Sequence, residues 1–135
     1  MRNALLVAAL LLSACAANKN TPLAEIPGLK TLDDVMENQA TAADPQFKKI
    51  GQATFDDAEL AALVQAAERI QATSLKTKDF SKGHKDPAAF EALTMKLNEQ
   101  AKALGAAASA KDAKAISATL EEMRGACREC HSKFR

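Results

Sequence analysis

The stretch "DPAAFEALTMKLNEQAKALGAAA", residues 86–108, decides what kind of fold this chain adopts. Its apolar residues recur at intervals of three and four, which is the period of one face of an α-helix. Asp86 followed by Pro87 is typical of a helix start, because aspartate caps the first turn and proline fits its first position. The stretch therefore predicts a long amphipathic helix whose buried stripe is formed by Phe90, Leu93, Leu97, Ala101, Leu104 and Ala108.

Downstream of this stretch, the same period returns after a short link, "ASAKD", at residues 108–112. The pattern predicts a last helix that begins near Asp112 and continues almost to the end of the chain. Cysteine and histidine side chains lie on or beside its buried stripe rather than in a solvent-exposed loop. The predicted stripe consists of Ile116, Leu120, Met123, Cys127, Cys130, His131 and Phe134.

Upstream of the stretch, two more helices are predicted. Residues 29–50 form the first, with a kink or break at Asp44-Pro45 and an end at Gly51. Residues 56–73 form the second, and the polar residues 74–86 after it predict a long loop. Four amphipathic helices joined in this way predict an all-α fold, an antiparallel up-and-down four-helix bundle.

The composition limits the classes of function. The 135 residues include many alanines but no Trp or Tyr, which favours helices, and the net charge is +1. A near-neutral chain has no strong field that would attract nucleic acid, so no such partner is predicted. The sequence also lacks an evident acid–base pair or a nucleophile with a base, and an enzyme is not predicted.

The N-terminus is predicted to be a targeting segment rather than part of the fold. Residues 1–14 contain one arginine followed by an apolar run of the length found in signal peptides, and they end before Cys15. The sequence "LSAC" resembles the bacterial lipobox, which implies that Cys15 is lipidated and anchors the protein on the periplasmic side of a membrane. Residues 15–28 then form a flexible tether, and Ala16 favours the outer membrane because it is not aspartate. The alternative is ordinary signal-peptide cleavage near Ala14 or Ala17.

The motif "CRECH", residues 127–131, has the C-x-x-C-H pattern of covalent haem attachment. Cysteines three apart on a helix project from nearly one side, so that both sulfurs can reach one porphyrin. The adjacent His131 would then bind the iron. A zinc site would need a fourth ligand, and a redox dithiol normally lies at a helix N-terminus, whereas this motif is near a C-terminus. In an exported protein, a disulfide between Cys127 and Cys130 is another alternative.

The bundle pattern and the ending "GACRECHSKFR", residues 125–135, resemble the class II c-type cytochromes, the cytochrome c′ family. Residues 50–70 are similar to the family's first loop and second helix. The resemblance implies one covalently bound haem c, attached through Cys127 and Cys130, with His131 as the proximal iron ligand. It also implies that the protein is an electron carrier or a binder of small gases.

The choice between these two activities depends on the sixth iron ligand. High-spin members of the family leave that position open and bind NO or CO, whereas low-spin members supply a methionine from the first helix. Met36 falls where that methionine falls, so the resemblance favours a low-spin carrier of single electrons. His84, in the predicted loop, is a rival ligand, although its lysine neighbours favour a solvated side chain. Core packing is the alternative role for Met36.

Basic residues surround the motif and suggest two further roles. They can pair with haem propionates, or they can steer an acidic redox protein towards the site. The expected partners are therefore periplasmic redox proteins, with a homodimer left open. A gas-binding or sensing protein with five-coordinate haem and a haem-free lipoprotein remain as alternative functions. The basic residues concerned are Arg124, Arg128, Lys133 and Arg135.

Overall fold

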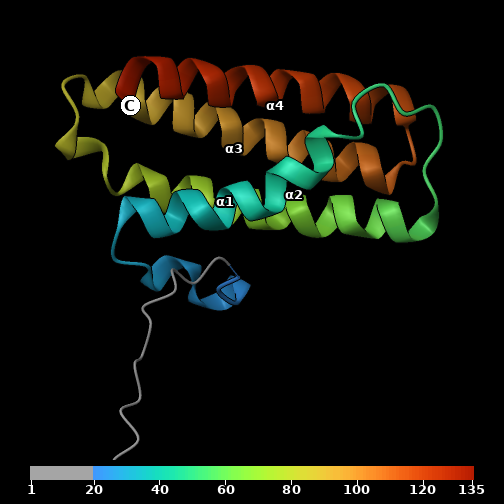
Figure 1. Cartoon of the computed structure of the whole chain (residues 1–135), viewed down its shortest axis with the longest axis horizontal. Coiled ribbons are helices and arrows are strands. Elements are labelled where there is room, and N and C mark those ends of the chain that lie inside the picture. Colours follow the sequence, from blue (N-terminus) through green and yellow to red (C-terminus); the bar gives the residue numbers. More distant parts are fainter. Residues whose placement is uncertain (1–19) are drawn as a thin grey trace, which may run out of the picture.

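The fold is an antiparallel bundle of four long helices, as the sequence predicts. The computed structural model describes residues 20–135 and contains α1 (Leu32–Phe47), α2 (Asp57–Lys78), α3 (Pro87–Ser109) and α4 (Ala113–Phe134). Figure 1 shows α1 and α2 forming one side of the bundle and α3 and α4 the other, with neighbouring helices running in opposite directions. None of the helices in residues 20–135 combines the length and the hydropathy that a membrane span requires.

Each long helix begins at a polar side chain that caps its first turn. Thr31, Asp56, Asp86 and Asp112 each accept a hydrogen bond from the backbone N–H three residues further on. These bonds satisfy backbone donors that have no partner within the helix. The predicted starts of α3 and α4 are therefore confirmed, with Pro87 as the first residue of α3.

The cap of α2 is reciprocal, and it carries a testable prediction. The Glu59 backbone N–H donates to Asp56 Oδ1 at 2.8 Å, and the Asp56 N–H donates to Glu59 Oε2 at 3.0 Å. Asp56→Ala should lower the free energy of unfolding by about 1 kcal/mol, measured by thermal or urea denaturation. Glu68→Ala, an exposed acidic position in the middle of the same helix, is the control and should change it by less than about 0.5 kcal/mol.

The prediction of a long loop at residues 74–86 is wrong for residues 74–78, because α2 continues to Lys78. Three hydroxyl residues of this part of α2, Thr73, Ser74 and Thr77, are buried in the bundle, and their hydroxyl groups are satisfied by carbonyls of the preceding turn. Thr73 Oγ1 donates to the Arg69 carbonyl at 3.0 Å, and Thr77 Oγ1 donates to the Thr73 carbonyl at 2.8 Å. The connection to α3 is therefore short and contains one 3₁₀ turn, η2 (Ser81–Gly83).

The first helix is shorter than the predicted 29–50, and proline does not break it at Asp44. Pro45 lies inside α1, two residues before its last residue, Phe47. Proline cannot donate a backbone hydrogen bond and presses on the carbonyl four residues earlier, and α1 ends only two residues beyond it. The chain then turns through Gly51, whose φ of +84° favours glycine and whose N–H donates to Ser117 Oγ at 2.7 Å.

The prediction of a flexible tether at residues 15–28 is also wrong for residues 20–28, the part of it that the structure describes. Residues 23–28 form a 3₁₀ helix, η1 (Leu23–Gly28), which lies against α2 (Figure 1). Ile26 and Thr21 are buried, at 0% and 3% exposure. Sequence composition suggested a linker, but the buried side chain of Ile26 and the hydrogen bonds of Thr21 dock the segment on the bundle. Cys15 and the predicted signal peptide, residues 1–14, lie outside the described residues.

Candidate functional site

A cavity of about 500 Å³ lies at the end of the bundle where α4 finishes. It forms because α1 packs mainly on α2 and α4 packs mainly on α3, so that α1 and α4 approach each other only slightly. Its volume is in the range of sites that hold a small organic ligand. The apolar part of its wall consists of Leu32, Met36, Ala40, Ala43, Phe47, Phe90, Leu93, Leu97, Ala126, Cys127 and Phe134.

The wall formed by α4 carries the C-x-x-C-H motif. Cys127, Cys130 and His131 all line the cavity, as the predicted stripe requires. Met123 and Ala126 lie beneath them, almost fully buried, whereas both cysteines are half-buried and His131 is exposed. Exposure to solvent therefore increases from Met123 to His131, because the cavity opens towards the end of the bundle. Both cysteines are free thiols that face the same space.

The thiols do not have the character of a redox pair. Burial is the main cause that raises the pKa of Cys127 to about 11, and the nearby Cys130 and Asp44 add to it. Burial, and then the charge of Glu129, also raise the pKa of Cys130. Reactive dithiols have lowered pKa values, so these two shifts oppose that alternative. Within residues 20–135, no three His, Cys, Asp or Glu side chains converge as a metal ion would require.

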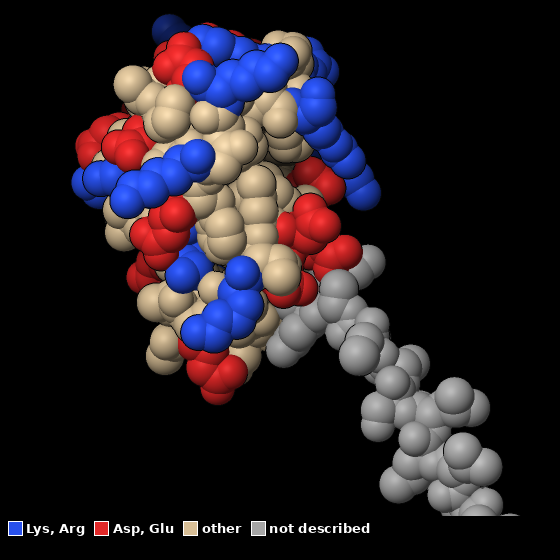
Figure 2. Space-filling view, turned by 90° about the vertical axis from the view of Figure 1, so that its left-hand side faces the viewer, with Lys and Arg blue, Asp and Glu red and all other residues tan. Residues whose placement is uncertain are grey.

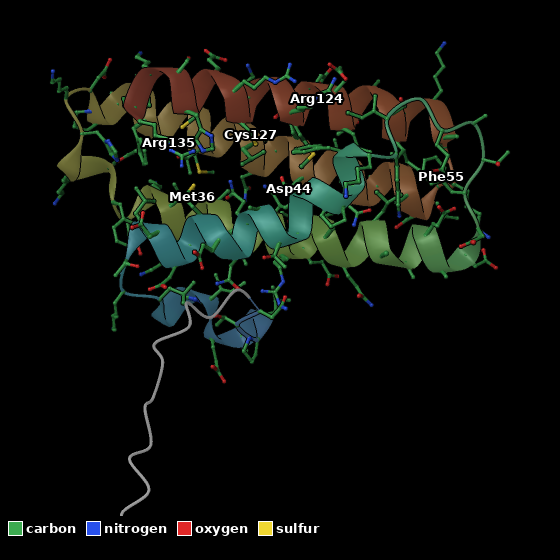
Figure 3. All side chains as sticks on the ribbon, in the orientation of Figure 1. Met36, Asp44, Phe55, Arg124, Cys127 and Arg135 are labelled. Atoms are coloured by element: carbon green, nitrogen blue, oxygen red, sulfur yellow. The ribbon has the colours of Figure 1, made fainter. Side chains whose placement is uncertain are left out.

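The facing wall is formed by α1 and carries the predicted methionine. Met36 lines the cavity together with Leu32 and Ala40, each one turn away from it, so these three residues share a face. Figure 3 shows Met36 on α1 and Cys127 on α4, on opposite sides of the cavity. Met95 and Met123 are not among the residues that line it. The structure therefore brings Met36, Cys127, Cys130 and His131 to one site.

Comparison with known protein families finds that the one described as Cytochrome C′ matches residues 29–135. The chain belongs to the cytochrome c′ family. Members of this family bind covalently attached haem c, and they carry electrons or bind gases. They are typically periplasmic proteins. No curated protein and no solved structure shows significant similarity to the chain.

The cavity fits the haem c of the cytochrome c′ family in its chemistry. It offers two thiols from one helix face, an imidazole next to them, and walls of mainly aliphatic and aromatic side chains, with the carboxylates of Asp33, Glu37 and Asp44 on the α1 side. The three hydroxyl residues in the wall, Ser74, Thr77 and Thr94, donate their hydrogens to backbone carbonyls of their own helices. Their place in the site was not predicted from the sequence, although Ser74 and Thr77 follow Ile70 at intervals of four and three residues, which puts them on the same helix face. These three hydroxyl groups therefore present no free donor to the cavity.

His84 lies in the cavity wall, which corrects the solvated position that its lysine neighbours suggested. Its ring stacks on Phe90 with centroids 4.0 Å apart and meets the edge of Phe134 at 5.4 Å. Phe134 is one turn beyond His131, so the three rings close the end of the site on the side of the motif. The composition of the loop does not predict this position of His84, because its aromatic partners, Phe90 and Phe134, come from α3 and α4.

The basic residues around the motif differ in their surroundings. Arg135 lines the cavity, whereas Arg124 pairs with Glu121 at 2.7 Å and Lys133 approaches Asp86 at 3.6 Å. Figure 2 shows this end of the bundle with basic and acidic side chains interspersed rather than a surface of one sign. Arg135 is therefore the basic residue that the structure places best for a carboxylate inside the site.

Proposed function

We propose that this member of the cytochrome c′ family is a carrier of single electrons with a six-coordinate, low-spin haem. The observation that carries the proposal is the position of Met36, which lines the cavity from α1 while His131 lines it from α4. His131 and Met36 would hold the haem iron from two different helices. Haem c supplies the one-electron iron couple when it is bound.

The residues of the chain have distinct roles in this proposal. Cys127 and Cys130 hold the cofactor through thioether bonds, and His131 and Met36 serve as the proximal and distal iron ligands. Ligation by histidine and methionine raises the reduction potential. The apolar side chains of α1 and α3 would pack against the faces of the porphyrin.

The resting spectrum tests this proposal against the gas-binding alternative. The purified oxidised protein should show a low-spin spectrum with the weak near-infrared band of a methionine sulfur bound to ferric iron. The reduced protein should bind CO slowly, because the thioether occupies the position that CO needs. A high-spin resting spectrum with rapid CO binding would instead support a gas-binding or sensing function.

We also propose that Cys15 is lipidated and holds the protein on the periplasmic face of a membrane, with the outer membrane preferred. The support is the sequence "LSAC" directly after a short apolar run. Several acyl chains on one cysteine anchor a protein stably, since each buried CH₂ adds about 0.8 kcal/mol. The expected partners are other periplasmic redox proteins.

Cys15→Ser should release the protein from the membrane. The wild type should sediment with membranes after cell lysis, and the variant should remain in the supernatant. Fractionation followed by haem staining measures this. Ser13→Ala, which changes a neighbouring residue and keeps the cysteine, serves as the control and should sediment like the wild type. A wild-type protein found in the soluble periplasmic fraction would contradict lipidation while leaving export possible.

A further inference from the structure

A buried polar network joins the segment before the family's matched region to α1 and α2. The Thr21 backbone N–H donates to Asn38 Oδ1 at 2.9 Å, and Asn38 Nδ2 donates to Thr21 Oγ1 at 3.3 Å. Arg69 of α2 completes it, because its Nη1 donates to the Thr21 carbonyl at 2.7 Å and to Asn38 Oδ1 at 3.2 Å. We refer to these three residues, Thr21, Asn38 and Arg69, as the clasp.

The clasp lies on the opposite side of α1 from the haem site. Asn38 is two residues after Met36, which separates their directions by about 200° around the helix axis. Asn38 is fully buried at 0% exposure, and its Nδ2 also donates to the Asp34 carbonyl at 2.9 Å within α1. A rotation or shift of α1 that moved Met36 out of the cavity would therefore have to break the clasp.

The angle of α1 is set mainly from the α2 side of the bundle, where α1 has its packing contacts. Because α1 and α4 hardly touch, α1 is positioned from behind, by α2 and by the docked segment. Ile26 of η1 reinforces this support from the same segment, with no surface exposed to solvent. The segment 20–28 precedes residue 29, where the match to the cytochrome c′ family begins.

We propose that Thr21, Asn38 and Arg69 are positioning residues for the Met36 ligand. By fixing the rotation of α1 on α2, the clasp keeps the thioether directed into the cavity and limits how often it leaves. The inference rests on the proposed ligation by Met36. It assigns a ligand-retaining role to a segment that composition alone marks as a linker.

The rate of CO binding to the reduced protein measures this role. CO can enter only when the Met36 sulfur has left, so its limiting rate at high CO concentration reports how often the sulfur leaves the iron. Asn38→Leu keeps the size of the side chain but removes its hydrogen bonds, and Arg69→Met removes the partner on α2. Each variant should raise the limiting rate about tenfold and weaken the near-infrared sulfur band.

Asn98→Leu is the matched control, because Asn98 is also a buried asparagine that joins two helices. It is 1% exposed, and its Nδ2 donates to the Gln71 carbonyl at 3.1 Å and to Ser74 Oγ at 3.0 Å, linking α3 to α2. This variant should lower the unfolding temperature by a similar amount but leave the CO rate and the sulfur band as in the wild type. The comparison separates ligand positioning from loss of stability.

The outcomes are distinct. A tenfold rise in both clasp variants with no rise in Asn98→Leu supports the inference. Equal rates in all three variants and the wild type, with a low-spin wild type, would overturn the clasp's role and leave Met36 ligation intact. A wild type that is already high-spin would overturn the proposed ligation and the clasp's role together. If Asn38→Leu does not fold, Arg69→Met decides the matter by the same measurements.

Discussion

Cys127→Ser should nearly abolish haem staining of the protein after denaturing electrophoresis, and Cys130→Ser should reduce it strongly. A serine hydroxyl does not form the thioether, and Cys127 is the more buried of the two thiols, beside Ala126. Without a covalently held ring, the apolar walls of the 500 Å³ cavity would face water or collapse. The free energy of unfolding should therefore fall by roughly 3 kcal/mol or more. The protein must be produced together with a haem-attachment system for this comparison.

Ser132→Ala is the control for these variants. Ser132 follows the motif directly, is exposed, and donates only to the Glu129 carbonyl of its own helix at 2.8 Å. Its staining and its thermal unfolding should match the wild type. If wild-type protein produced in the same cells shows no haem stain, the assignment of Cys127 and Cys130 as attachment residues is wrong.

Met36→Ala should convert the iron from low spin to high spin and open the site to small gases. Alanine offers no ligand atom, and its smaller side chain leaves space beside Leu32 and Ala40. CO affinity should rise by at least about tenfold, because the thioether no longer competes for the iron. The reduction potential should fall, since histidine–methionine ligation favours the reduced state. Optical spectra, CO titration and potentiometry measure the three effects.

Met95→Ala separates this effect from the general loss of a methionine. Met95 lies on α3 and does not line the cavity. This variant should keep the low-spin spectrum, the near-infrared band and the slow CO binding of the wild type. If Met36→Ala behaves like Met95→Ala, Met36 only packs in the core, and the sixth ligand must come from another residue.

The parts of the site that could be predicted from the sequence are those encoded within one helix. The stripe of α4 places Cys127, Cys130 and His131 together because their spacing alone fixes their directions. Met36 shares a face with Leu32 and Ala40 for the same reason. Capping residues such as Asp86 and Asp112 could be predicted equally well, since each bonds only the backbone N–H three residues further on.

The parts that could not be predicted depend on contacts between distant segments. His84 is drawn into the cavity wall by Phe90 and Phe134, which its polar neighbours in the sequence do not indicate. Residues 20–28 look like a linker, yet Ile26 and the clasp dock them on the bundle. The end of α2 contains serine and threonines, which are poor helix formers by themselves but are buried here against the rest of the bundle.

The bonded hydroxyl groups of Ser74, Thr77 and Thr94 have a consequence for the kinetics of electron transfer. Each of these groups carries a dipole, and each dipole is fixed because its hydrogen is already bonded to a carbonyl of its own helix. Fixed dipoles cannot rotate when the charge beside them changes by one unit. In the proposed electron carrier, these three groups would therefore add little to the reorganisation energy when the iron gains or loses an electron.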